Sequence, residues 1–116
     1  MQLLQEVLPN EHIESQVKFS ELPRAIIDFY IPNIKVAIEC KACGLTPVQE
    51  QVLIKHQRRQ DVLKSQGIKY VWWVDRERAS LVPRTRGYLE NVFYNCLGEQ
   101  KRFVEFLKEC QMQAHK

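Results

Sequence analysis

Three side chains that could act together in catalysis lie on two consecutive apolar segments. Asp28 belongs to the segment AIIDFYI, and Glu39 and Lys41 belong to the segment VAIECK. Both segments are rich in Ile, Val, Phe and Tyr, and Pro32-Asn33 between them is a turn signal, so the pattern predicts a β-hairpin. Because side chains alternate along a strand, Glu39 and Lys41 would share one face and Cys40 would lie on the other. Such a charged pair marks either a solvated strand end or a working site, since burying one charge alone is costly.

Two carboxylates and an ammonium group are suited to the hydrolysis of a phosphodiester. The reaction builds negative charge, which a divalent metal ion stabilises while it lowers the pKa of a bound water. Mg²⁺ prefers oxygen ligands and needs only one or two carboxylates. We therefore expect Asp28 and Glu39 to bind Mg²⁺, with Mn²⁺ able to replace it. Lys41 would position or deprotonate the attacking water.

The arrangement of Asp28, ten further residues and then Glu39-Cys40-Lys41 resembles the PD-(D/E)XK nuclease superfamily, whose members share the restriction-endonuclease-like fold. The resemblance is to the small single-domain members and extends from Met1 to about Asp75. It departs from the motif at Ile27, where a proline would stand. The resemblance implies a metal-dependent endonuclease acting on DNA, with the backbone carbonyl of Cys40 as a further metal ligand.

The same resemblance suggests two further site residues. In this superfamily a helix before the first strand often adds an acidic ligand, and Glu6 is the best-placed candidate, with Glu11 and Glu14 as competitors. A solvent-facing role for Glu6 is an equal alternative. Gln16 resembles a glutamine that some small members keep on the first strand near the metal.

The elements that must position these residues follow from hydrophobic spacing and from helix-end signals. A helix between two strands is a crossover connection, so the strand after the long helix should run parallel to the second strand of the hairpin. The expected fold is α/β, with a central mixed sheet of four or five strands and helices on both faces. The predicted elements are a helix over Met1–Val7, strands over His12–Phe19, Ala25–Ile31, Ile34–Lys41 and Ile68–Val74, a helix from Thr46 to Gln66 that ends at Gly67, a short edge strand at Ser80–Val82, and helices over Gly87–Leu97 and Glu99–Gln113.

Basic residues gather on the long helix and after the last predicted strand. They are Lys55, Arg58, Arg59, Arg84 and Arg86. They could contact the backbone of a nucleic acid, or they could form an ordinary solvated surface. His56, also on the long helix, has no metal-type partner at useful spacing, so we expect a structural or surface role for it.

Composition sets the outer limits. A chain of 116 residues with 45% hydrophobic and 27% charged residues is expected to form one globular domain over residues 1–116. We expect it to be cytoplasmic, because there is no apolar run long enough for a membrane span and no signal-peptide pattern. The net charge of +3 permits a polyanionic partner. The four cysteines are expected to be reduced and mostly buried, and their use as zinc or iron–sulfur ligands is the alternative; they are Cys40, Cys43, Cys96 and Cys110.

The leading hypothesis is therefore a small Mg²⁺-dependent nuclease with DNA as its partner and no membrane partner. The alternative is a nucleic-acid-binding or assembly module of the same fold, which cuts only inside a larger complex or not at all. A single active site cuts one strand, so a double-strand cutter would need a symmetric dimer. The apolar faces of the C-terminal helices could form that interface or could simply cover the sheet.

Overall fold

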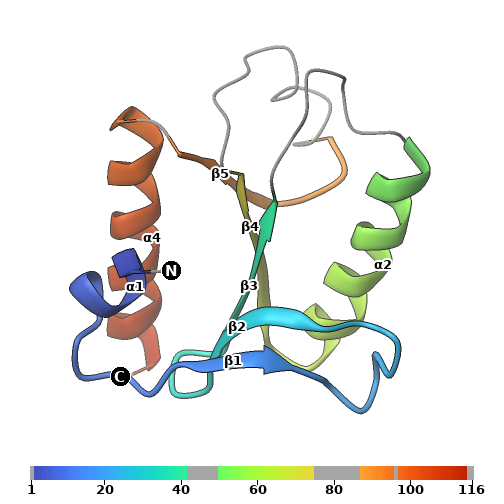
Figure 1. The fold of residues 1–116 in the computed structure, drawn as a ribbon, viewed down its shortest axis with the longest axis horizontal. Coiled ribbons are helices and arrows are strands. Elements are labelled where there is room, and N and C mark those ends of the chain that lie inside the picture. Colours follow the sequence, from blue (N-terminus) through green and yellow to red (C-terminus); the bar gives the residue numbers. More distant parts are fainter. Residues whose placement is uncertain (1, 42–49, 75–86, 96, 115–116) are drawn as a thin grey trace.

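A computed structural model describes residues 2–41, 50–74, 87–95 and 97–114 of the chain. These residues form a mixed five-stranded sheet with three helices, an α/β fold (Figure 1). In chain order the elements are α1 (Gln2–Val7), β1 (Glu14–Val17), β2 (Ile27–Ile31), β3 (Val36–Lys41), α2 (Glu50–Ser65), β4 (Lys69–Val74), β5 (Asn91–Tyr94) and α4 (Leu97–Ala114).

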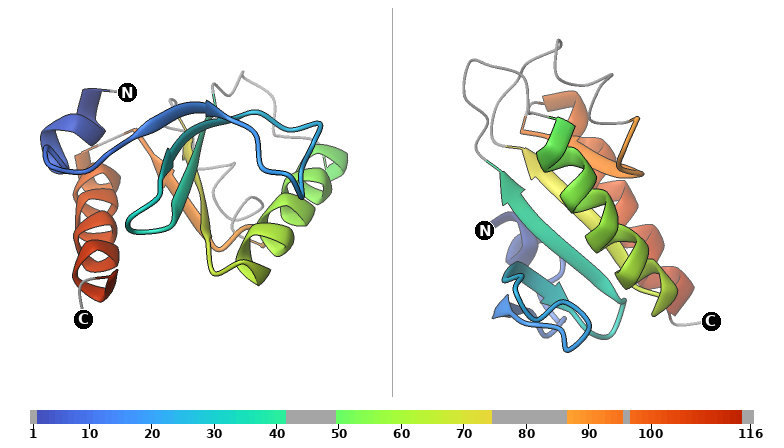
Figure 2. Two further views of the ribbon diagram at one scale, coloured as in Figure 1. Left: turned by 90° about the horizontal axis from the view of Figure 1, so that it is seen from below. Right: turned by 90° about the vertical axis from the view of Figure 1, so that its right-hand side faces the viewer.

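The strands lie in the sheet in the order in which they occur in the chain. The first three form the predicted antiparallel meander, with Phe29 of β2 beside Ile38 of β3. The next two run parallel to β3, and Glu39 is in register with Trp72 of β4. The predicted parallel alignment of β3 and β4 is thus confirmed. Figure 2 shows that the β1–β2 ribbon crosses the end of the sheet from the side of α1 and α4 toward α2.

Helices cover both faces of the sheet, as expected. Leu53 and Leu63 of α2 pack in one core with the β4 side chains of Tyr70 and Trp72. On the other face, α1 and α4 pack against the alternate residues of the same strands. This second core includes Leu4, Leu8, Val36, Ile38, Val71, Trp73, Phe93, Phe103 and Leu107. The strict alternation along β3 and β4 explains why their segments are almost continuously apolar.

One predicted helix is wrong. We expected a helix over Gly87–Leu97, but this region contains β5, and α4 begins at Leu97. The segment NVFY is short, apolar and rich in β-branched and aromatic residues, and hydrophobic spacing cannot distinguish a strand of this kind from one turn of a buried helix. Burial on both faces favours the strand, because Val92 and Tyr94 join the α2 core while Phe93 joins the α4 core. The predicted strand at Ser80–Val82 lies outside the described residues.

The end of α2 follows the predicted chemistry. Gly67 has φ +75°, and the backbone amides of Gly67 and Ile68 donate to the carbonyls of Lys64 and Leu63. This pair of bonds is the Schellman arrangement, in which glycine accommodates the left-handed conformation. The predicted cap at Thr46 lies outside the described residues. Within the part of the chain that is described, no helix has the length and apolar character needed to cross a membrane.

Candidate functional site

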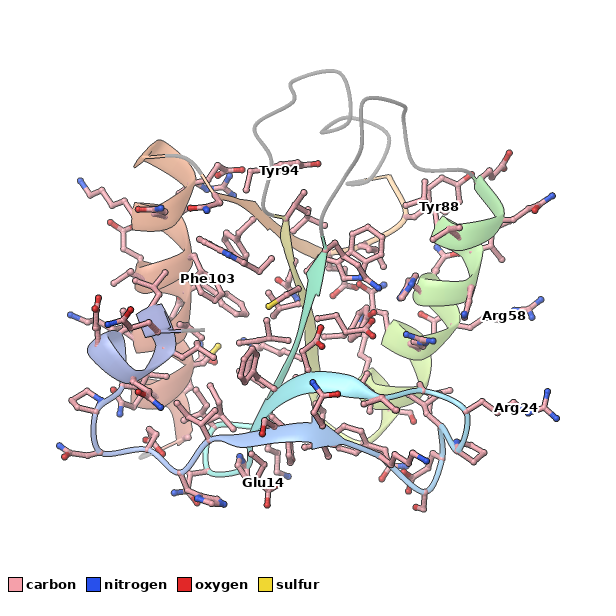
Figure 3. All side chains as sticks on the ribbon, in the orientation of Figure 1. Glu14, Arg24, Arg58, Tyr88, Tyr94 and Phe103 are labelled. Carbon is pink, nitrogen blue, oxygen red and sulfur yellow. The ribbon has the colours of Figure 1, made fainter. Side chains whose placement is uncertain are left out.

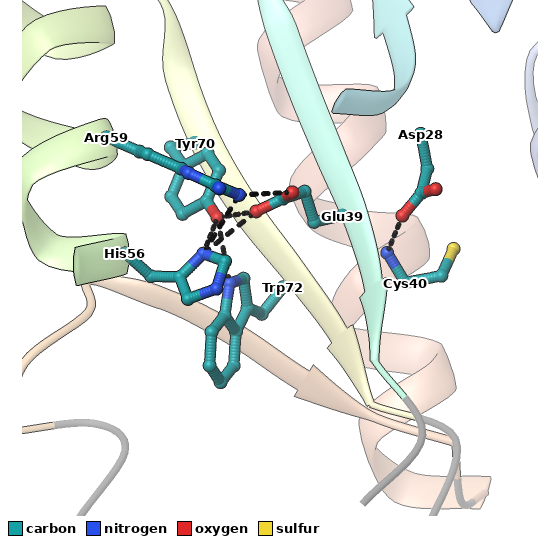
Figure 4. A network of polar contacts seen from close by, with 7 residues as sticks. All are labelled: Asp28, Glu39, Cys40, His56, Arg59, Tyr70 and Trp72. Carbon is teal, nitrogen blue, oxygen red and sulfur yellow. Dashed lines mark hydrogen bonds and ion pairs between the residues drawn. The ribbon is translucent and has the colours of Figure 1, made fainter. Parts of the chain in front are cut away.

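Glu39 is a buried carboxylate near the carboxyl end of β3. It is only 3% exposed. Its Oε1 accepts a hydrogen bond from Arg59 Nη1 at 2.8 Å. Its Oε2 accepts a hydrogen bond from the hydroxyl of Tyr70 and lies 3.0 Å from Nδ1 of His56 (Figure 4). Burial of this charge is therefore accompanied by the pairing and hydrogen bonding that make a buried carboxylate tolerable.

Two periodicities bring these partners together. His56 and Arg59 are three residues apart on α2, so they lie on the same side of the helix. Tyr70 and Trp72 are two residues apart on β4, so both face α2. Trp72 Nε1 donates to the Tyr70 hydroxyl at 3.0 Å, and this extends the network along β4.

The hydrogen-bond inventory assigns the tautomer of His56. The carboxylate of Glu39 only accepts hydrogen bonds, and the single Tyr70 hydroxyl hydrogen is directed to Glu39. The Nδ1 of His56, 2.7 Å from the Tyr70 oxygen and 3.0 Å from Glu39, must therefore carry a hydrogen. The 3.5 Å approach of Arg59 Nη1 to Nδ1 then joins two donors, so it is not a hydrogen bond.

The site holds Glu39 ionised and His56 neutral. Burial by itself raises the pKa of Glu39, but the hydrogen bond from His56 and the charges of Lys41 and Arg59 outweigh burial, so the pKa is lowered. Burial lowers the pKa of His56 more than the neighbouring carboxylate raises it. At neutral pH the contact between His56 and Glu39 is thus a hydrogen bond from a neutral ring, and Arg59 is the cation that contacts the carboxylate.

Lys41 lies on the same face of β3 as Glu39, as the alternation predicted. Its Nζ lies 5.5 Å from the centre of the Trp72 ring, and the ring belongs to the α2 side of the sheet. Lys41 is only partly buried. Its ammonium is therefore held over an aromatic face at the end of the strand, beside the buried network.

Asp28 lies across from Glu39 but faces a different group. Continuing the register of Phe29 and Ile38 by one residue places Asp28 opposite Glu39. The Oδ2 of Asp28 accepts a hydrogen bond from the backbone N–H of Cys40 at 2.8 Å. In Figure 4 the two carboxylates point to opposite sides of β3, Glu39 toward α2 and Asp28 toward the Cys40 backbone. The structure thus brings the two residues to neighbouring positions without directing their oxygens at one point.

The two residues suggested by the resemblance are placed differently from each other. Glu6 is exposed on α1, whose Leu4 packs in the α4 core, so Glu6 belongs to the opposite face of the sheet from Glu39. Gln16 lies between Ser15 and Val17, which pair with Phe29 and Ile27 on either side of Asp28. It has φ +53° and is exposed. The structure therefore brings Gln16, but not Glu6, to the strand position next to Asp28.

A basic groove runs between α2 and the segment before β2. It has a volume of about 590 Å³, and its lining includes Arg24, Lys55, Arg58, Arg59 and the single carboxylate of Glu21. Figure 3 shows the side chains of Arg24 and Arg58 extending outward on the same side of the molecule. Among the described residues, Arg24, Lys55 and Arg58 form no ion pair. Arg84 and Arg86 lie outside the described residues.

The donors present suit a hard cation, although they are not gathered around one point. Asp28, Glu39 and the Cys40 carbonyl offer only oxygen ligands, which is the chemistry that Mg²⁺ requires. Asp28 is only partly buried and uses one oxygen for the Cys40 amide. Within the described residues, no three His, Cys, Asp or Glu side chains lie close enough to hold a metal ion together. Metal binding by both carboxylates would therefore need Glu39 to exchange one of its protein donors.

No protein-family model, curated protein or solved structure matches the chain. Function is therefore inferred from the residues of the site.

Sequence reasoning missed three members of the network. His56 was expected to be structural or exposed, yet it is 4% exposed and contacts Glu39. Tyr70 and Trp72 were hidden in a continuous apolar strand. The available signal was the polar atom that each carries on the face of β4 shared with α2, together with the spacing of His56 and Arg59 on one side of the helix.

Proposed function

We propose that this chain is a metal-dependent nuclease that hydrolyses phosphodiester bonds in DNA, with a restriction-endonuclease-like fold of the PD-(D/E)XK type. The observation that carries the proposal is the ionised, buried Glu39 at the end of β3, with Lys41 on the same face and the basic groove reached through Arg59. A buried carboxylate kept charged by specific partners beside a cleft is a recognised feature of functional sites.

Each residue has a role in this proposal. Asp28 and Glu39, with the carbonyl of Cys40, would hold Mg²⁺ or Mn²⁺, which when bound would stabilise charge on the phosphate and lower the pKa of a water. Lys41 would orient the attacking water and accept or share its proton. Arg58 and the other exposed cations of the groove would hold the phosphate backbone, and these contacts carry no sequence information.

A second candidate is a nucleic-acid-binding or assembly module of the same fold that does not cut by itself. It is favoured by the occupied state of the carboxylates, because both oxygens of Glu39 already accept hydrogen bonds and Asp28 binds the Cys40 amide. In this alternative Glu39 and Asp28 stabilise the ends of β2 and β3, and the groove alone interacts with the polyanion.

Cleavage assays separate the two candidates. The purified protein is incubated with plasmid, junction, flap and single-stranded DNA in the presence of Mg²⁺, Mn²⁺ or EDTA. Asp28→Asn retains an oxygen that can accept from Cys40 N–H but removes the ligand charge, so the nuclease proposal expects a folded, inactive protein. Glu14→Gln on β1 is the matched control, since Glu14 is a partly exposed carboxylate near His12 and outside the site. Metal-dependent cutting that survives in Asp28→Asn would place the active site elsewhere. Tight DNA binding without cutting of any substrate would favour the second candidate.

A further inference from the structure

Arg59 differs from the other cations of α2 because it faces two anion sites at once. Its side chain is 12% exposed and its guanidinium contacts Glu39 at 2.8 Å. The same residue lines the basic groove. Lys55 and Arg58, on the same helix, are exposed and contact no carboxylate in the described part of the chain. Arg59 therefore lies at the boundary between the buried carboxylate and the surface proposed to receive the DNA backbone.

The two oxygens of Glu39 are held by different kinds of donor. Oε2 accepts from the neutral groups of Tyr70 and His56. Among the described residues, Oε1 has Arg59 as its hydrogen-bond partner. The Oε1 contact is thus the one that can be exchanged while the connections of Glu39 to β4 and to His56 remain.

We infer that Arg59 acts as an internal counter-ion that competes with the divalent metal for Glu39, and that it turns to a backbone phosphate in the groove when the metal is bound. This inference rests on the proposed function and adds its regulation. With Arg59 on Glu39, the carboxylate is neutralised and cannot also offer full charge to a metal. With Arg59 released, its charge must find another anion, and the groove that it lines is the place where DNA phosphate is proposed to lie. Metal binding and DNA binding would therefore favour each other through Arg59, and the coupling acts equally in both directions.

The competition has a consequence that can be measured without DNA and without activity. Arg59→Met removes the competing charge but keeps much of the apolar stem. Mg²⁺ should then bind at least about tenfold more tightly than to the wild type, which is the effect of removing one positive charge roughly 5 Å from a dication even in a water-like dielectric. Arg58→Met is the matched control, because it removes an equal charge from the same helix at an exposed position. Its Mg²⁺ affinity should stay within about threefold of the wild type. Calorimetry with Mg²⁺ alone measures all three proteins.

The wild-type protein supplies an independent reporter. Trp72 donates to Tyr70, and Tyr70 donates to Glu39, so the indole N–H of Trp72 senses any change at the carboxylate. The chain has two tryptophans, and Trp73 lies on the other face of the sheet against Phe103. In a proton–nitrogen NMR spectrum, Mg²⁺ should shift the Trp72 indole signal and the Arg59 guanidinium signal, and it should leave the Trp73 indole signal nearly unchanged.

The outcomes distinguish the inference from the function beneath it. Tighter Mg²⁺ binding by Arg59→Met than by Arg58→Met and the wild type supports the competition. Equal or weaker binding by a folded Arg59→Met overturns it, and the nuclease proposal still stands if the wild type binds Mg²⁺ and cuts. If neither folded protein binds Mg²⁺ or Mn²⁺ at millimolar concentration, the metal site itself is refuted, and the inference with it. If Arg59→Met does not fold, the wild-type NMR titration decides, because bound Mg²⁺ that leaves the Arg59 and Trp72 signals unmoved would contradict the release of Arg59.

Discussion

Arg59→Met in the absence of metal tests the energetics of the buried pair. Removing Arg59 leaves a carboxylate that is 3% exposed without its contacting cation. Breaking a buried pair in this way costs about 3–5 kcal/mol. Tyr70 and His56 continue to donate to Glu39, so we expect a loss near the lower end, about 3 kcal/mol. For a domain of this size the loss corresponds to a fall in Tm of roughly 10–15 °C.

The loss should also depend on pH, and the direction follows from Glu39. Without Arg59 the pKa of Glu39 in the folded protein rises, because one of the charges that lowers it is gone. As the pH falls, the folded mutant can then take up a proton on Glu39 and relieve the uncompensated charge. The difference in unfolding free energy between the wild type and Arg59→Met should therefore be large at pH 8 and smaller at pH 5.

Urea unfolding in EDTA at the two pH values measures this difference. Arg58→Met should change stability by less than about 0.5 kcal/mol, as expected for an exposed side chain. Adding Glu39→Gln to Arg59→Met removes the orphaned charge and should recover much of the loss, which gives the coupling energy of the pair. A loss below about 1 kcal/mol, or a loss of the same size at both pH values, would refute the reasoning that Arg59 neutralises a buried, ionised Glu39.

Three further predictions follow from the site. Lys41→Met should still bind Mg²⁺ and DNA but should cut DNA roughly two to four orders of magnitude more slowly in single-turnover assays, and cutting at the parental rate would remove Lys41 from the mechanism. Replacing Arg24 and Arg58 with Gln should weaken DNA binding and reduce the slope of log K against log salt by about 0.9 for each phosphate that the protein no longer neutralises, whereas an unchanged slope would return this face to solvent. Because the pKa of His56 is lowered in the folded state, the unfolded chain takes up a proton first as the pH falls below about 6.5, so stability in EDTA should decline there. His56→Asn should flatten that decline and His12→Asn, at an exposed position, should not; equal profiles for both variants would contradict the assignment.

Much of the fold could be predicted from local patterns. The hairpin, the long helix with its end at Gly67 and the parallel β4 each depend on signals within a few residues of one another. The segment around Val92 could not be assigned in this way, because four apolar residues satisfy a helical and an extended pattern equally well. Its strand conformation depends on pairing with Val71–Val74 in the parallel ladder, and nothing in the local sequence reports that pairing.

The site was predictable only along one strand. The shared face of Glu39 and Lys41 follows from alternation, and the structure has it. The partners of Glu39 are distant in the chain, since Arg59 is 20 residues away and Tyr70 is 31 residues away. The direction of the Asp28 side chain depends on the backbone amide of Cys40, which donates to it from the neighbouring strand. Contacts of this kind arise from packing α2 on the sheet and from strand pairing, and sequence spacing does not determine them.

The energetics of the network bear on why it exists. A buried ion pair with its hydrogen bonds is seldom more stable than well-packed apolar side chains of similar volume. Leu53 and Leu63 show that the layer between α2 and the sheet accepts such side chains, since both are fully buried there. The same layer nevertheless contains Glu39, Arg59 and His56, whose charges and polar atoms must all be matched. Stability alone does not account for them, and this is the physical reason for proposing that the chemistry of the protein takes place at the end of β3.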